Sequence, residues 1–112
     1  MELEGTRWIV TQLEGAPVIE GSQPSILFEG GRAAGTTGCN RWFAAYRAEG
    51  VSLSFGPAGS TMMMCPDPGV MEQEQSMLRT LDLVETVTLA EDSLTMSGSE
   101  ATELLKAESE SR

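Results

Sequence analysis

The stretch RWFAAYRAEGVSLSF, residues 41–55, alternates apolar and polar side chains on both sides of the turn signal AEG. A period of two is typical of β-strands that bury one face and expose the other. The apolar positions are Trp42, Ala44, Tyr46, Val51, Leu53 and Phe55. The stretch therefore predicts a β-hairpin in an antiparallel sheet whose one face covers a core.

Five further segments have a strand pattern and end in turn signals such as EGAP and AEDS. They are residues 6–13, 25–29, 83–89, 93–97 and 103–107. The last is ambiguous, because ATELLKAESE is also a fair helix by propensity. Together with the hairpin, these segments predict about seven short strands. Trp8 and Trp42 lie in strand patterns whose apolar face must be covered, so we expect both to be mostly buried.

The pattern changes to a helical period after Cys65. Apolar residues with one polar member recur three or four positions apart at Val70, Glu74, Met77, Leu78 and Leu81. Asp67 is well placed as the N-cap and Pro68 as the first helical residue. These features predict one α-helix over about residues 68–81. Glu72 and Glu74 would lie near the positive end of its dipole, which favours their charge.

The order of elements indicates an α+β protein that is mostly β. It predicts an antiparallel sheet or partly closed barrel with one helix packed on it. The 112 residues and 12.0 kDa suit one domain spanning 1–112, with a core over about residues 3–107. Seven basic against seventeen acidic residues give a net charge of −10, which disfavours nucleic acid and suits a soluble monomer. No apolar run is long enough to predict a membrane span.

The residue types leave little room for catalysis. Without any histidine, neither a Ser-His nor a Cys-His pair can form, and imidazole zinc sites are excluded. Glu72 and Glu74 are two positions apart on a helix, so they point in different directions and cannot act as a paired acid and base. The glycines at 30, 31, 35 and 38 do not form a phosphate loop and are interpreted as turns and bulges. The sequence thus predicts no enzymatic activity, no catalytic residue, no metal and no cofactor.

Cys39 and Cys65, the two cysteines of the chain, allow three interpretations. They could form a disulfide, which would stabilise the fold by roughly 3–4 kcal/mol in the chain-entropy model. They could remain as buried thiols, as expected in the cytosol. They could also have a reactive or metal-binding role, since the thioethers and thiol of TMMMC suit Cu(I). Against copper, a strand would send alternate side chains of that run to opposite faces.

Three motifs carry a resemblance to a known family. LEGTRWIVTQLEGAPV, GCNRWFAAY and GSTMMMCPDPGVMEQEQSML occur in that order and together span nearly the whole chain. They resemble the motifs of the META domain family, also called HslJ-like. The residues that match are Gly5, Thr6, Trp8, Gly38, Cys39, Asn40, Arg41, Tyr46, Thr61, Met63, Cys65 and Glu74. The chain departs from the family at Met62, where relatives often carry Arg or Lys, and at Ala44 and Ala45, where they often carry Gly.

The resemblance implies a small β-rich domain without enzymatic activity. It implies a bacterial, stress-associated protein of the cell envelope if a leader has been removed, and otherwise a cytoplasmic one. Because Cys39 and Cys65 both lie within family motifs, it favours a disulfide between them. We expect a binding domain for an unknown protein, peptide or small apolar ligand. The alternative is a purely structural domain appended to a larger chain, with no ligand of its own.

Overall fold

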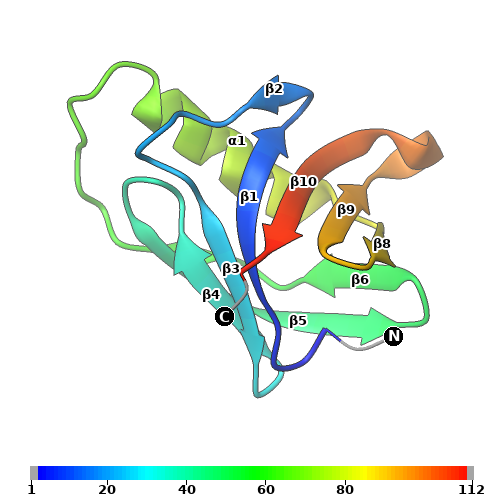
Figure 1. The fold of residues 1–112 in the computed structure, drawn as a ribbon. Helices are drawn as coiled ribbons and strands as arrows, with labels where there is room; N and C mark the ends of the chain where they lie inside the picture. The colour runs from blue at the N-terminus through cyan, green and yellow to red at the C-terminus, as the bar shows by residue number, and fades with distance from the viewer. Residues whose placement is uncertain (1–2, 111–112) are drawn as a thin grey trace.

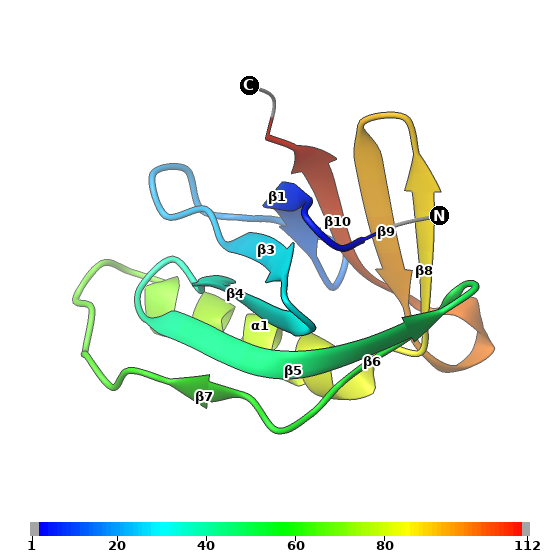
Figure 2. The same ribbon diagram turned by 90° about the horizontal axis from the view of Figure 1, so that it is seen from below.

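A computed structural model of the protein describes residues 3–110, in which eight antiparallel strands close into a barrel (Figures 1 and 2). Around the barrel the order is β10-β9-β8-β6-β5-β4-β3-β1, and pairing of β10 with β1 closes it. The strands are β1 (Arg7–Leu13), β3 (Ser25–Glu29), β4 (Arg32–Thr36), β5 (Arg41–Glu49), β6 (Ser52–Phe55), β8 (Thr86–Ala90), β9 (Ser93–Ser97) and β10 (Glu103–Ser109). The predicted class, mostly β with a barrel and one helix, is confirmed.

The inward side chains of the strands form one hydrophobic core. Trp8 and Trp42 are only 4% and 1% exposed, so the expectation that both are buried is confirmed. Phe28 lies between the rings of Tyr46 and Phe55, with centroids 4.8 and 6.2 Å away. Aromatic contacts of this kind stabilise beyond the area they bury. The hairpin of β5 and β6, which the sequence pattern predicted, thus contributes the aromatic side chains of Trp42, Tyr46 and Phe55 to the core.

The helix α1 (Val70–Leu83) packs against β1 and β6, and its residues Met77 and Leu81 enter the core. Its predicted start at Pro68 is wrong, and so is the N-cap at Asp67. Gly69 takes the N-cap position with φ of 81°, in the left-handed region, and no side chain caps the helix. A left-handed residue at that point separates Pro68 from the helix, so the helix begins at Val70.

Three strands were missing from the sequence prediction: β4, β2 (Ala16–Pro17) and β7 (Gly59–Ser60). The last two have two residues each. β4 was missed because Ala and Gly dominate it, and these residues are depleted in strands. Gly35, interpreted as a turn or bulge, lies inside β4.

Two further details of the strand prediction are settled. Val51 is not on the buried face of the hairpin, because it lies in the turn and is 56% exposed. The ambiguous last segment is the strand β10. A short 3-10 turn, η1 (Ser99–Ala101), precedes it. The strand β10 pairs with β1 over five residue pairs from Trp8–Ser109 to Leu13–Leu105. Closure of the barrel decides between strand and helix there, and no local propensity could reveal it.

A close approach between β3 and β4 explains Gly35. The indole Nε1 of Trp42 donates to the backbone oxygen of Ser25 at 3.2 Å. A Cβ atom on residue 35 would lie 1.9 Å from that same oxygen, which is impossible without movement of the backbone. Gly35 therefore leaves the space in which the buried tryptophan finds its acceptor.

We expect Gly35→Ala to destabilise the protein by about 1–3 kcal/mol, since the added methyl group forces the strands apart. Gly56→Ala is the control, because its new Cβ would meet ordinary contacts of 3.9 Å. Urea unfolding followed by tryptophan fluorescence measures both. Equal stability of the two variants would contradict the close approach at Gly35.

Candidate functional site

The second and third sequence motifs meet around the side chain of Asn40, which is 1% exposed. Its amide nitrogen donates to the backbone oxygen of Met63 at 3.0 Å and to Oε1 of Glu74 at 2.9 Å. Its amide oxygen accepts from Thr61 Oγ1 at 2.8 Å and from the Met63 backbone N–H at 2.7 Å. All four hydrogen bonds that this amide can make are therefore formed. We call Thr37, Asn40, Thr61, Gln73 and Glu74 the polar cluster.

Helix α1 contributes Glu74 and Gln73 to the polar cluster. Thr37 Oγ1 donates to Glu74 Oε1 at 2.7 Å, and the Gln73 amide nitrogen donates to the backbone oxygens of Ser22 and Thr37. Gln73 and Glu74 are each only 8% exposed. The sequence predicted Glu74 as a charge near the helix start, but not its burial or its two side-chain partners. Glu74 is a buried acceptor that ties the helix to the loop before β5.

Gln73 and Thr37 were not singled out from the sequence. The available signal was that Gln73 lies three residues after Val70, on the side of the helix that carries the apolar stripe. A polar side chain there is expected to have buried partners. Gly38 completes the loop with φ of 100°, and a Cβ on it would lie 2.3 Å from the Ser22 backbone oxygen.

Cys39 and Cys65 are joined by a disulfide beside the polar cluster. Their Cα atoms are 6.0 Å apart, within the usual range of about 4.4–6.8 Å. The bond links the loop before β5 to the irregular segment that leads into α1. Neither sulfur is then available as a nucleophile or as a thiolate ligand.

The first motif forms a separate set of contacts at the start of β1. Thr6 Oγ1 donates to the backbone oxygen of Leu3 and accepts from the indole nitrogen of Trp8 at 2.8 Å. Gly5, with φ of 86°, makes the turn that precedes them. These contacts position the tryptophan in the core, so the Gly-Thr-x-Trp motif has a structural role.

Glu4 lies next to this motif and binds the turn between β3 and β4. Tyr46 donates its hydroxyl to Glu4 at 2.6 Å, and the backbone N–H groups of Gly30 and Gly31 also donate to this carboxylate. The tyrosine hydrogen bond is the main cause that lowers the pKa of Glu4, and the two backbone bonds lower it further. Tyr46 of the GCNRWFAAY motif therefore connects β5 to the N-terminal segment.

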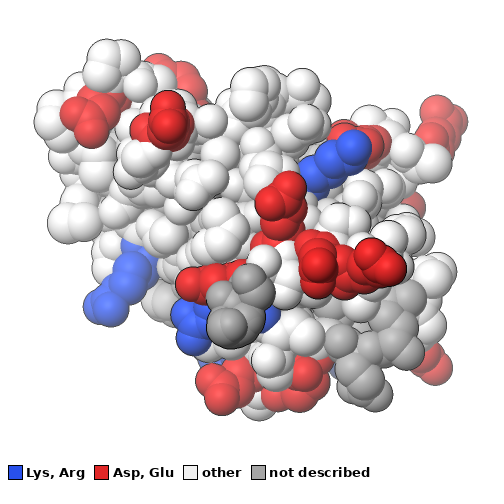
Figure 3. All heavy atoms as spheres, in the orientation of Figure 1, with Lys and Arg blue, Asp and Glu red and all other residues white. Residues whose placement is uncertain are grey.

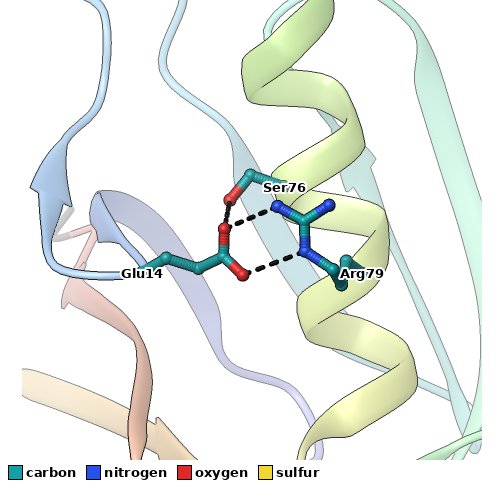
Figure 4. A network of polar contacts seen from close by, with 3 residues as sticks. All are labelled: Glu14, Ser76 and Arg79. Atoms are coloured by element: carbon teal, nitrogen blue, oxygen red, sulfur yellow. Dashed lines mark hydrogen bonds and ion pairs between the residues drawn. The ribbon is translucent and has the colours of Figure 1, made fainter.

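A third polar contact joins the β1–β2 turn to the helix (Figure 4). Arg79 binds both carboxylate oxygens of Glu14, at 2.7 and 3.0 Å, and Ser76 donates to the same carboxylate at 2.8 Å. The hydrogen bond from Arg79 is the main cause that lowers the pKa of Glu14, with Ser76 second. Both charged groups are partly solvated, so water weakens the attraction between them.

None of these carboxylates forms a metal site. No group of three or more His, Cys, Asp or Glu side chains within residues 3–110 could hold a metal ion. Figure 3 shows acidic side chains spread over one face, with basic ones at fewer places. No helix of the described chain is long and apolar enough to cross a membrane.

A hollow of about 610 Å³ lies on the outer face of β1, β3, β4 and β5. The strand register explains its shape. Arg7 pairs with Leu27, Leu27 with Ala34, and Ala34 with Phe43, so one row of side chains crosses four strands. The small Ala34 stands between the larger Leu27 and Phe43, so the row is lowest over β4. We call this hollow the β4 groove.

The β4 groove differs in charge from the rest of the molecule. Arg7 and Arg41 line it, and none of its lining residues is acidic. Three smaller hollows elsewhere are each lined by at least one carboxylate. Arg7 lies 3.6 Å from Glu110, whereas Arg41 has no ion pair within residues 3–110. Neither the hollow nor Phe43 was predicted from the sequence, because both depend on the register of four strands.

We expect Glu74→Ala to destabilise the protein by about 3 kcal/mol, because Thr37 and Asn40 lose a buried acceptor. Glu74→Gln keeps an oxygen for both donors and should cost less than about 1 kcal/mol. Glu72→Ala, on the exposed face of the same helix turn, is the control. Thermal unfolding compares the three variants. If Glu74→Ala melts with the control, the polar cluster does not hold the helix.

Reduction of the disulfide should lower the free energy of unfolding by roughly 3–4 kcal/mol, because the unfolded chain regains the entropy of the open loop. Denaturant unfolding with and without reductant measures the difference, and intact mass shows the gain of two hydrogens. A variant with Cys39→Ser and Cys65→Ser should not respond to reductant. Unchanged mass and stability of the parent would contradict the bond.

Comparisons with known proteins agree with this fold. An NMR structure of a protein from Burkholderia xenovorans has a TM-score of 0.78 at 24% identity, covering 98% of this chain and 85% of that one. A crystal structure of a DUF4847 family protein from Bacteroides vulgatus has a TM-score of 0.69 at 11% identity, covering 93% and 92%. At these identities the likeness shows the fold alone.

No curated protein matches the chain. The model of the META domain matches residues 1–111, almost the full length. This match includes all three motifs, whose residues form the start of β1, the polar cluster and the disulfide. The chain therefore belongs to the META domain family.

Proposed function

We propose that the protein is a non-enzymatic, monomeric binding domain of the bacterial cell envelope, and that its ligand occupies the β4 groove. The observation that carries the proposal is a groove of about 610 Å³ with two arginines and no lining carboxylate, on a chain of net charge −10. Small-molecule sites commonly have volumes of about 300–1,000 Å³ and a few polar groups among apolar walls. The envelope location and a role in stress come from the family resemblance.

The walls of the β4 groove indicate the kind of ligand. Leu27, Ala34 and the half-exposed ring of Phe43 offer apolar contact. Arg41 and Arg7 offer cationic donors along the same hollow. A guanidinium binds a carboxylate through two parallel hydrogen bonds. We therefore propose a ligand with an apolar body and a carboxylate, such as a short apolar peptide with a free C-terminus.

The polar cluster supports a binding role over a catalytic one. The side chains of Asn40, Gln73 and Thr37 make their hydrogen bonds with Glu74, with Thr61 and with the backbone. A catalytic side chain needs access to the reacting atoms of a substrate. The buried motif residues of this chain therefore serve the fold, whereas the motif residues Arg41 and Thr61 line the β4 groove, where a ligand can reach them.

The probe for this proposal is the dipeptide N-acetyl-Leu-Phe, compared with its C-terminal amide. We expect the acid to shift amide resonances of β3, β4 and β5 and to bind more tightly than the amide. Arg41→Gln should weaken binding of the acid at least about tenfold, since a hydrogen bond to a charged group contributes roughly 1.5–3 kcal/mol. Titration followed by NMR measures these affinities.

Arg47→Gln is the matched control, because it removes the same charge from β5 outside the β4 groove. It should leave the affinity for the acid within about twofold of the parent, as expected for a distant exposed charge. Equal binding of acid and amide, or equal effects of the two arginine variants, would contradict the proposed site. Absence of any shift with either probe would favour the purely structural alternative.

A further inference from the structure

Three consecutive methionines are unusually exposed in the segment between β7 and α1. The exposed fractions of Met62, Met63 and Met64 are 88%, 58% and 81%. We call residues 62–64 the methionine loop. Two other methionines, Met77 and Met96, are fully buried in the core. Met71 on the helix is partly exposed, so the methionine loop and the core are the two extremes of exposure among the described methionines.

The methionine loop is held by its backbone and its neighbours. Asn40 binds both the N–H and the carbonyl of Met63. The N–H of Thr61 donates to the Arg41 oxygen at 3.0 Å, and Cys65 is fixed by the disulfide. None of these bonds uses a methionine side chain. The thioether groups are thus presented to solvent on a fixed backbone and contribute little to the core.

We propose that the methionine loop is an oxidant-reactive modification site, whose co-reactants are hydroperoxides of the hydrogen peroxide type. In each reaction the thioether sulfur attacks the outer peroxide oxygen, forming an S–O bond while the O–O bond breaks. The sulfur loses two electrons and becomes a sulfoxide, and hydrogen peroxide is reduced to water. Both hydrogens of the peroxide leave in that water, so the step needs no other reactant.

Exposure favours the reaction in the loop over the core. A sulfoxide at Met62 or Met64 stays in water, so its new polar oxygen is solvated at once. At Met77 or Met96 the same oxygen would be buried among apolar side chains without a donor, which is strongly unfavourable. The two cysteines are bonded to each other, so no thiol of this chain competes for the oxidant. The loop can therefore consume about three oxidant equivalents, one for each thioether, while the fold persists.

The test exposes the folded protein to graded hydrogen peroxide and locates added oxygen by peptide mass mapping. We expect Met62, Met63 and Met64 to gain one oxygen each, at least about tenfold faster than Met77 and Met96. The oxidised protein should keep its melting temperature and its far-UV circular dichroism. Equal rates at loop and core methionines, or unfolding that accompanies the first additions, would overturn the proposal.

A variant with Met62→Leu, Met63→Leu and Met64→Leu is the matched control. It should melt with the parent, because the loop is held by backbone bonds, and its uptake of oxygen under mild conditions should fall to that of the remaining methionines. A markedly lower melting temperature would show that the side chains hold the loop and would overturn the backbone argument. Oxygen uptake equal to that of the parent would place the reactive sites elsewhere.

Discussion

The side-chain amide of Asn40 holds the irregular segment that connects the barrel to the helix. Residues 61–69 form neither strand nor helix, so no ladder of backbone hydrogen bonds fixes them. Asn40 supplies two bonds to the Met63 backbone and one to Thr61, and its fourth bond reaches Glu74 on the helix. An aspartate could not donate these bonds, and a leucine could neither donate nor accept them. One buried amide thus sets the path between barrel and helix.

The small residues of β4 have two consequences on opposite faces of the barrel. On the inside, Gly35 lets the Ser25 carbonyl reach the indole of Trp42. On the outside, Ala34 leaves the space between Leu27 and Phe43 that becomes the β4 groove. A larger side chain at either position would change the packing of a core tryptophan or fill the hollow. The Ala and Gly residues that prevented the prediction of β4 from strand propensity are therefore also the cause of the β4 groove.

The sequence predicted those elements whose pattern is local. The hairpin of residues 41–55 and the apolar stripe of α1 have periods that follow from backbone geometry alone. The role of Glu74 could not be predicted in this way, because helical spacing tells which face a residue occupies but not what lies opposite. Its partners Thr37 and Asn40 are 37 and 34 residues away in the chain. The β4 groove needs the register of four strands, and no pattern within one strand contains that information.

The polar cluster also connects the buried Asn40 to residues at the surface of the molecule. Thr61 donates to Asn40 through its hydroxyl, and the same hydroxyl accepts the backbone N–H of Arg41. Arg41 and Thr61 both line the β4 groove, and Thr61 immediately precedes the methionine loop. The buried amide therefore positions one end of the groove and the start of the loop at once. Because these links run through the Arg41 backbone and through Thr61, the Arg41 and methionine side chains stay free to meet what lies outside the protein.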